Sequence, residues 1–565
     1  NLGFNLVAKR KLPLESHSIQ DLTALQNLAA LSGPFLKEDA PSSKHVAVIG
    51  SGVAGMTCAH DLAILGNRVR VFEAQQVPGG MLVLGVPEYR LPRSLIRAEI
   101  DAILDLGVEI RFGQTLGKDF LIRDLWSQGF DAVFLAIGAH KSRELRMEGV
   151  ELDGVFRALE FLLNVNLDYR VNLGRRVVVV GGGDVAMDAA RSAARELLAE
   201  EVRLSTAHVG VINGSLDAAS AMREAMDVAR EAMRRGTREV QVVCLESWEE
   251  MPAQRFEVEE AIEEGVMLHT RLGPKRILGE DGKVRGIEML AVRSVFDEKG
   301  RFNPAFVEGS EQVMEADSVI LAVGQTSDLS FLTPEDSVEL TPRGTIKVDL
   351  ETMATTAPGI FAGGDVALGP RIFIEGVETG HRAARGIHEY LSGRKIRVEK
   401  REHWAGIDFR EQHFFGAAET RRPWLPVVQQ GYEKIPRESP PAIPVDRRIG
   451  IAEVELCYGE MEARRQASRC LRCGMNPIFD ATRCILCGGC VDVCPHWCLR
   501  MVPLPEIEEG ETLSRLVEAP LGSPAGSAMI MDTTACIRCS LCALRCPTGA
   551  ITMESFQFVE ELTYE

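Results

Sequence analysis

The sequence predicts an α/β chain built from two parallel-sheet domains, one inserted in the other, followed by a small α+β domain. Three patterns carry this prediction. A strand–glycine–helix stretch lies at 46–55, a second lies at 177–186, and two cysteine runs lie between residues 484 and 546. The length of 565 residues also favours several domains over one.

The first glycine loop has the features of a Rossmann-like dinucleotide-binding unit. Residues 46–49 form a short apolar run typical of a buried parallel strand. The glycines of the Gly-x-Gly-x-x-Gly motif are Gly50, Gly52 and Gly55. The first allows a tight turn, the second lets a pyrophosphate approach the backbone, and the third lets the helix pack on the strand. A second strand, 69–72, ends in Glu73, an acid placed to bind a ribose hydroxyl. A ligand-free strand–helix turn is the alternative.

The second glycine loop repeats the device with a different spacing to its acid. Residues 177–180 predict a β-branched strand. The motif residues that follow are Gly181, Gly183 and Ala186. An acid about 20 residues further on is expected but absent. The next strand with an acid at its end runs over 240–246 and ends in Glu246, so a helical insertion is expected at about 200–236.

Two cysteine runs predict a ferredoxin-like iron–sulfur domain. Both follow the bacterial pattern C-x2-C-x2-C-x3-C-P, in which the fourth cysteine of each run binds the other cluster. One predicted [4Fe–4S] ligand set is Cys484, Cys487, Cys490 and Cys546, and the other is Cys536, Cys539, Cys542 and Cys494. Zinc or free thiols are the alternatives, and two matching runs make them much less favoured.

Four further cysteines leave the number of clusters open. They are Cys457, Cys470, Cys473 and Cys498. Their number equals the ligand count of a third [4Fe–4S] cluster, and Cys470-x2-Cys473 has cluster-like spacing. Small buried thiols are the competing interpretation. Cys58 and Cys244 stand alone in the dinucleotide domains, so a redox-active dithiol beside the first glycine loop is not expected.

Composition excludes some partners. The formal net charge of −18 argues against nucleic acid, because phosphate contacts need clustered Lys and Arg. No apolar run approaches a membrane span in length, and the first residues lack a signal pattern. The clustered cysteines favour a reducing, cytoplasmic setting. The expected segments are 1–44 (helical arm), 45–155 and 326–395 (first dinucleotide domain), 156–325 (second dinucleotide domain), 396–455 (extended linker) and 456–565 (iron–sulfur domain).

Several stretches together resemble one family. They are VIGSGVAG, PGGMLVLGVPEYRLP, VVVVGGGDVAMDAAR, EEMPA and GIFAGGDV. Over about residues 45–395 the chain is similar to the small subunit of glutamate synthase and its relatives, which include the N-terminal half of dihydropyrimidine dehydrogenase and a bifurcating transhydrogenase subunit. The resemblance implies that FAD is bound by Gly50, Gly52, Gly55, Glu73, Gly80, Met81, Gly364 and Asp365. It implies that the nicotinamide nucleotide is bound by Gly181, Gly183 and Ala186.

The sequence departs from that family in two places. Relatives carry an N-terminal cysteine domain, and residues 1–44 contain no cysteine. Relatives also carry two arginines before the serine of the EEMPA stretch, where this chain has Leu245 and Glu246. An acid at that position accepts hydrogen bonds from the ribose of NAD and repels the 2′-phosphate of NADP. A solvated strand-end charge is the alternative for Glu246.

These features predict an electron-transfer subunit that links NAD(H), FAD and [4Fe–4S] clusters. A hydride carries two electrons and a cluster takes one, so a flavin is expected between them. No acid–base catalytic residue is needed. No region remains for an organic substrate, so the expected partner is another subunit of a redox complex, such as a 2-oxoacid oxidoreductase, a glutamate synthase or an aromatic acyl-CoA reductase system. The alternatives are a stand-alone NAD(P)H:ferredoxin oxidoreductase or bifurcating enzyme, and a non-catalytic cluster scaffold.

Overall fold

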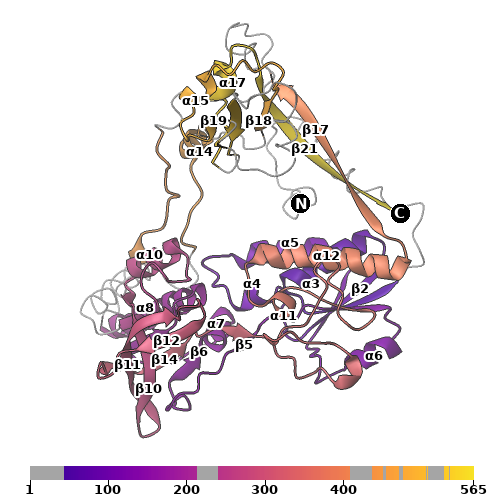
Figure 1. Cartoon of the computed structure of the whole chain (residues 1–565). Helices are drawn as coiled ribbons and strands as arrows, with labels where there is room; N and C mark the ends of the chain where they lie inside the picture. The colour runs from indigo at the N-terminus through magenta and orange to yellow at the C-terminus, as the bar shows by residue number, and fades with distance from the viewer. Residues whose placement is uncertain are drawn as a thin grey trace. The chain divides into compact units, whose positions relative to one another are not determined.

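The computed structural model divides the chain into two compact units (Figure 1). Unit 1 comprises residues 1–394 and 442–456, and unit 2 comprises residues 395–441 and 457–565. The structure describes residues 44–212, 239–407, 435–448, 453–469, 475–503, 506, 527–532 and 535–564. The predicted N-terminal arm and residues 213–236 of the expected helical insertion therefore lie outside the described residues.

Five parallel strands form the first sheet of unit 1, in the order β16-β4-β1-β2-β3. Their bounds are β1 (His45–Ile49), β2 (Arg68–Glu73), β3 (Glu109–Phe112), β4 (Ala132–Leu135) and β16 (Ile360–Ala362). Strand β16 comes from beyond the second domain, so the first domain is discontinuous, as the sequence predicted. The central strands are buried on both faces, which is typical of a parallel sheet covered by helices.

The helices of the first domain include α3, which follows the first glycine loop and packs against α12 (Figure 1). Helix α12 begins at Phe373. The helices are α3 (Val53–Ile64), α4 (Met81–Leu84), α5 (Arg93–Leu104), α6 (Ile122–Ser127), α11 (Asp365–Leu368), α12 (Phe373–Ser392) and the 3-10 turn η1 (Pro334–Asp336). Among the described helices, none is long and apolar enough to cross a membrane.

The second sheet is also parallel, in the order β6-β14-β7-β8-β9. Its bounds are β6 (Val155–Arg157), β7 (Arg176–Val180), β8 (Glu239–Val243), β9 (Met267–His269) and β14 (Ser318–Leu321). Alternate residues of β7 enter two cores. Val177 and Val179 pack with α7 (Ala158–Asn166) and α8 (Asp184–Ile212), while Val178 and Val180 pack on the opposite face. Side chains alternate across a strand, so one β-branched run supplies both cores.

An antiparallel layer, which the sequence analysis did not identify, covers that opposite face. It comprises β10 (Leu272–Glu280), β11 (Lys283–Phe296), β12 (Phe302–Phe306) and β13 (Gln312–Glu315). The two connections between the domains pair with each other as β5 (Lys141–Ser142) and β15 (Gln325–Thr326). Each connection follows a buried strand, β4 or β14, and the residues Ala-x-Gly that come directly after it. The stretches DAVFLAIG and DSVILAVG therefore have equivalent places in the two domains.

Unit 2 holds the cysteine runs between two small sheets. One sheet has the order β17-β21-β18, and the other pairs β19 with β20. The elements are β17 (Ile396–Ile407), β18 (Met475–Phe479), β19 (Leu499–Pro503), β20 (Ser527–Met531), β21 (Ile551–Tyr564), α14 (Glu460–Ala467), α15 (Gly489–Asp492) and α17 (Leu541–Arg545). Its core is built largely of cysteines, methionines and Ile551.

The structure differs from the predicted extended linker at both ends of the range 396–455. Strand β17 pairs with β21 over its whole length, from Ile396 with Tyr564 to Ile407 with Met553. Residues 442–456 instead belong to unit 1 and contain the 3-10 turn η3 (Val445–Arg447). Strand pairing between distant segments leaves no local sequence signal. The charged residues around β17 are typical of solvent-exposed chain and do not indicate a strand. Residues 408–434 lie outside the description.

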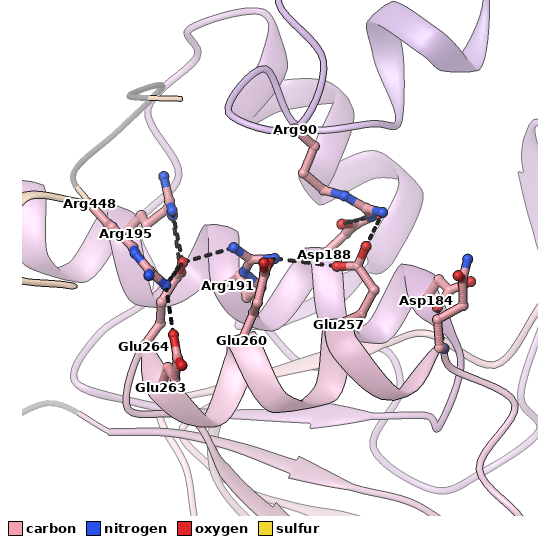
Figure 2. A network of polar contacts seen from close by, with 11 residues as sticks. Arg90, Asp184, Asp188, Arg191, Arg195, Glu257, Glu260, Glu263, Glu264 and Arg448 are labelled. Atoms are coloured by element: carbon pink, nitrogen blue, oxygen red, sulfur yellow. Dashed lines mark hydrogen bonds and ion pairs between the residues drawn. The ribbon is translucent and has the colours of Figure 1, made fainter. Parts of the chain in front are cut away.

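A buried network of ion pairs joins four segments of unit 1 (Figure 2). Arg191 of α8 is 1 % exposed, and its guanidinium donates to Glu260 Oε2 at 2.5 Å and Glu264 Oε1 at 2.8 Å. Arg90, from the loop that follows α4, donates to Asp188 Oδ1 of α8 at 2.6 Å and also to Glu257. The network therefore ties the 85–92 loop of the first domain to two helices of the second.

The segment 442–456, which belongs to unit 1, joins the same network. Arg448 approaches Glu263 Oε2 at 3.3 Å and Glu264 Oε1 at 3.5 Å, at the end of α10 (Arg255–Glu263). Tyr89 lies 4 % exposed under the guanidinium of Arg195, whose Cζ is 3.8 Å from the ring centroid. Removing one partner of a buried pair costs about 3–5 kcal/mol, so this network makes the relative placement of its four segments costly to change.

Burial sets the protonation behaviour of Glu257 in this network. Its side chain is 1 % exposed, and this burial raises the pKa of Glu257 to about 7, although Arg90 opposes the shift. In Glu264, burial acts in the same direction, but hydrogen bonds from Arg195 and Arg191 hold the pKa below its usual range. One network thus contains a carboxyl that gains a proton near neutrality and another that stays charged.

We predict that Glu257→Gln weakens the pH dependence of stability. The folded chain holds a proton on Glu257 up to about pH 7, whereas the unfolded chain releases it near the usual glutamate value. The proton therefore stabilises the fold at low pH, and this contribution is lost as pH rises through 7. Between about pH 5.5 and 8 the wild type should lose about 1–3 kcal/mol that the variant does not lose.

Melting temperatures of both proteins across this pH range measure the difference. Glu260→Gln is the matched control, because Glu260 lies on the same helix and binds the same Arg191, but its side chain is 25 % exposed. It should leave the wild-type slope in place. Equal slopes for the wild type and Glu257→Gln would contradict the prediction.

Candidate functional site

The first glycine loop borders a cavity of about 500 Å³ in unit 1. Seven of the eight residues predicted to bind FAD line this cavity: Gly50, Gly52, Glu73, Gly80, Met81, Gly364 and Asp365. They come from β1, β2, α4 and α11, which are far apart in sequence, and the carboxyl ends of parallel strands bring them together. The eighth residue, Gly55, does not line the cavity.

Each glycine of the first loop has its own steric reason. Gly50 has φ +104°, and a Cβ there would overlap the carbonyl oxygen of Ala136. A Cβ on Gly55 would overlap the carbonyl oxygen of Gly50, so Gly55 allows α3 to lie close to the strand. Gly52 is different, because its φ is −70° and a Cβ would meet nothing within 4 Å. A side chain on Gly52 would thus take space in the cavity without clashing with protein.

Backbone N–H groups face the cavity at the start of α3. Gly52 is the N-cap of that helix, and no side chain caps it. Val53 and Ala54, the first residues of the helix, both line the cavity. Unpaired N–H groups at a helix N-terminus attract phosphate oxygens, so this end of the cavity suits a pyrophosphate.

Glu73 is held in place by the middle residue of the loop. Its Oε2 accepts hydrogen bonds from the backbone N–H of Ser51 at 2.9 Å and from Ser51 Oγ at 2.5 Å. Its Oε1 accepts from the N–H of Gln75 at 2.8 Å. The carboxylate is 7 % exposed and keeps further acceptor positions, because two carboxylate oxygens offer about four. It can accept further hydrogen bonds from hydroxyl donors at the cavity wall.

Gly80, Gly364 and Asp365 also line the cavity, close to the first glycine loop. A Cβ on Gly80, which has φ +53°, would lie 2.8 Å from the Cα of Gly52, so the two glycine segments touch. Gly364 has φ +69° and immediately precedes α11. Burial raises the pKa of Asp365 to about 6, against a hydrogen bond from the N–H of Arg371 at 3.2 Å. No side-chain cation that the structure describes is bonded to this carboxyl, so hydroxyl donors suit it.

The second glycine loop has the same construction. Gly181 has φ +147°, and a Cβ there would overlap the carbonyl oxygen of Ala322, as Gly50 does with Ala136. A Cβ on Gly183 would meet nothing within 4 Å, which matches Gly52. Ala186 is fully buried in the core under α8. The two loops are therefore equivalent in position and in steric requirement.

The acid of the second domain lies at a different place on its strand than expected. Strand β8 ends at Val243, so Glu246 lies in the following turn and not at the strand end. In the strand register, Cys244 takes the position that Glu73 has in the first domain. The chain nonetheless turns back, and a Cβ on Gly182 would lie 2.7 Å from Glu246 Oε2. The carboxylate thus reaches the middle residue of the second glycine loop.

Two cavities in unit 2 divide the cysteines into the two predicted sets. One cavity is lined by Cys484, Cys487, Cys490 and Cys546. The other is lined by Cys494, Cys536, Cys539 and Cys542, and also by Cys498. In each case the fourth cysteine of one run lies with the first three of the other. Cysteine sulfurs around one small cavity are the donors that iron–sulfur clusters require, so these residues fit that group.

The other cysteines have separate surroundings. Cys457 is exposed, while Cys470 and Cys473 lie outside the described residues. Among the described residues, no three His, Cys, Asp or Glu side chains come close enough together to hold a single metal ion. Cys58 and Cys244 are 0 % and 2 % exposed and lie in different domains of unit 1.

Part of the cavity wall was not predicted from the sequence. The missed residues include Gln114, Thr115, Phe331, Arg371 and Ile372. They lie on loops after β3, before α12 and beside η1, and no motif spacing marks them. The Ser51–Glu73 pair had a signal, because a hydroxyl between the motif glycines is within reach of the strand-end acid. The Arg90–Asp188 link had none.

Comparison with known proteins gives the family. The profile described as pyridine nucleotide-disulphide oxidoreductase matches residues 44–386, and the profile described as 4Fe-4S dicluster domain matches residues 483–550. The chain belongs to the pyridine nucleotide-disulphide oxidoreductase family and carries a C-terminal ferredoxin domain. The matched residues thus comprise the dinucleotide domains of that family and a domain of the 4Fe-4S type. Only Cys58 and Cys244 fall within the first match, and they lie in different domains, so the family's disulphide is not represented there.

Three relatives illustrate the similarity. The NADP(+)-dependent formate dehydrogenase subunit beta of Moorella thermoacetica is 36 % identical, over 76 % of this chain and 55 % of that protein. The NADPH-Fe(3+) oxidoreductase subunit beta of Geobacter sulfurreducens is 31 % identical, over 78 % and 63 %. The glutamate synthase (NADPH) small chain of Escherichia coli is 31 % identical, over 62 % and 69 %.

The chain thus spans less than two thirds of the first two relatives. Among solved structures, FprA of Mycobacterium tuberculosis in complex with NADPH is 18 % identical, over 62 % of this chain and 85 % of that chain, with a TM-score of 0.49.

The two open glycines give a matched pair of variants. We predict that Gly52→Val abolishes FAD binding, because its side chain enters the cavity where the pyrophosphate approaches the backbone. Gly183→Val should retain FAD but lose reduction by the nicotinamide nucleotide. Neither side chain meets protein atoms within 4 Å at its Cβ, so both variants should fold. Flavin absorbance of the purified variants and its bleaching by NADH are the measurements; normal flavin content in Gly52→Val would refute the assignment.

Proposed function

We propose that this chain transfers electrons between NAD(H), FAD and two [4Fe–4S] clusters as one subunit of a larger redox enzyme. The observation that carries the proposal is that one chain contains a dinucleotide cavity, a second glycine loop of the same construction, and two separate cysteine-lined cavities. A bound flavin accepts a hydride and gives up its electrons singly, which makes it the link between a two-electron and a one-electron carrier.

The residues of the chain bind and orient in this scheme. The N–H groups at the start of α3 would hold the pyrophosphate of FAD, and Glu73 would accept its ribose hydroxyls. Asp365 would accept a hydroxyl of the ribityl chain. The glycines at 50, 52, 80 and 364 let the backbone approach the cofactor. No side chain has to move a proton, because hydride transfer needs only the stacking of two rings.

The relatives support a complex but not a particular one. Those of Moorella and Geobacter are named as beta subunits, and that of Escherichia coli as a small chain. By analogy, the partner of this chain would hold the organic or one-carbon chemistry, as in a 2-oxoacid oxidoreductase, a glutamate synthase or an aromatic acyl-CoA reductase system. A stand-alone reductase would instead reduce soluble ferredoxin without any partner.

Anaerobic titration of the purified full-length chain with NADH tests the proposal. The flavin absorbance should bleach, and the signals of reduced [4Fe–4S] clusters should appear in electron paramagnetic resonance spectra. Two clusters correspond to about 8 iron atoms per chain and three to about 12. Gly183→Val should keep its flavin and clusters oxidised under the same conditions. A wild type whose flavin is not bleached by either coenzyme would support the scaffold alternative and refute the proposal.

We further propose that Glu246 makes the chain prefer NADH over NADPH. Its carboxylate lies against Gly182, the middle residue of the second glycine loop, as Glu73 lies against Ser51 in the first loop. A negative charge there favours two ribose hydroxyls and repels a 2′-phosphate. The side chain of Arg271, the residue whose N–H bonds to the carbonyl of Glu246, pairs with Glu250 at 2.8 Å. The named relatives use NADP(H), and the acid at 246 is the proposed reason for a difference.

We predict that Glu246→Arg shifts the coenzyme preference toward NADPH by about one to two decades, the size of 1–3 kcal/mol for a charged hydrogen bond. The measured quantity is the ratio of kcat/KM for the two coenzymes with an artificial one-electron acceptor. Glu249→Arg is the charge-matched control, because Glu249 is exposed on the same turn. A wild type that prefers NADPH would contradict the prediction and direct attention to Arg271.

A further inference from the structure

The second cysteine-lined cavity contains one cysteine more than a cluster needs. Cys494, Cys536, Cys539 and Cys542 form the expected ligand set, and Cys498 lines the same cavity. The first cavity has four cysteines and no fifth. A [4Fe–4S] cluster binds four thiolates, so one sulfur of the second cavity has no place in the usual arrangement.

The internal repeat of unit 2 shows what occupies this position in the other half. Cys494-Pro-His-Trp-Cys498 corresponds to Cys546-Pro-Thr-Gly-Ala550, each at the end of its run. Cys498 is 6 % exposed and Ala550 is 2 % exposed, and each lines the cavity that contains its own fourth cysteine. The two positions are therefore equivalent, and one carries a methyl group where the other carries a thiol.

The thiol of Cys498 lies beside the ligand sulfur and is fixed there. Cys494 Sγ and Cys498 Sγ are 3.2 Å apart, within reach of an S–H···S hydrogen bond. The carbonyl of Cys498 accepts from the N–H of Asp532 at 2.8 Å, and the next residue, Leu499, begins β19. The pairing of β19 with β20 therefore holds the backbone next to Cys498. Both cysteines line the same cavity.

We propose that Cys498 is a reserve ligand of the second cluster, able to replace Cys494 on the same iron. This inference rests on the proposed function, because it assumes that both cavities hold [4Fe–4S] clusters. In the exchange, the iron–sulfur bond to Cys494 would break and a bond to Cys498 would form, while the proton of the Cys498 thiol would pass to the sulfur of Cys494. No electron is transferred. The assignment also removes Cys498 from the residues available for a third cluster.

The two halves of the repeat supply a matched test in the full-length chain. Cys494→Ala and Cys546→Ala each remove the fourth ligand of one cluster, but only the first leaves a spare cysteine. Cys494→Ala should keep the iron content of the anaerobically purified wild type and its reduced-cluster resonance. Cys546→Ala should lose roughly one to four iron atoms per chain, as should the double variant Cys494→Ala/Cys498→Ala. Cys498→Ala alone should keep its iron, because Cys494 remains.

A gain-of-ligand variant keeps the test decisive if single variants fold poorly. Cys546→Ala/Ala550→Cys places a thiol at the equivalent position of the first cavity and should recover the iron lost in Cys546→Ala. Equal iron loss in Cys494→Ala and Cys546→Ala, with no recovery in that double variant, would overturn the reserve-ligand inference. A wild type with clearly fewer than about 8 iron atoms would instead overturn the two-cluster function on which it rests.

Discussion

A buried guanidinium has to be surrounded by carboxylates, and Arg191 meets this requirement by bringing distant segments of the chain together. Its partners lie on α10, and that helix in turn holds Arg90 and Arg448. Arg90 belongs to the stretch that begins with the cavity residues Gly80 and Met81. The helix that starts at the second glycine loop and the loop that follows the cavity-lining helix α4 are therefore fixed by one set of charges. The proposed hydride transfer would depend on this spacing, because two rings must meet in a single geometry.

Groups around the cavity of the first domain are likewise held in place by other parts of the protein. The N–H groups at the start of α3 are preorganised, and Ser51 orients Glu73 before any ligand arrives. Donors and acceptors that are already in place cost little reorganisation when charge appears between them. The glycines contribute because they lack a side chain, which lets the backbone at Gly80 lie close to the backbone at Gly52. Chemistry is thus left to the cofactors, and the protein supplies distance and orientation.

Local patterns predicted what depends on local sequence. The β-branched strand before each glycine loop, the loops themselves and the cysteine partition all follow from short motifs with fixed spacing, and the fold class followed from them. Features that depend on pairing between distant segments were not predictable: β17 pairs with β21 across more than 140 residues, and the β10–β13 layer has no motif. The Arg90–Asp188 bond is of the same kind. Glu246 was located in sequence, but its turn beyond β8 was not, because a strand end is poorly marked by residue type.

Duplication gives the chain a way to vary function at constant geometry. Gly50 and Gly181 meet the same steric demand in two dinucleotide domains, yet one loop is followed by Ser51 and Glu73 and the other by Gly182 and Glu246. The two halves of the iron–sulfur unit are equally alike, except that Ala550 stands where Cys498 does. In both pairs the shared residues build the loop or cavity, and the differing residue lies beside it. The differing residue is therefore where the proposals place coenzyme choice and cluster ligation, because a change there alters the surroundings of a ligand without disturbing the packing that both copies need.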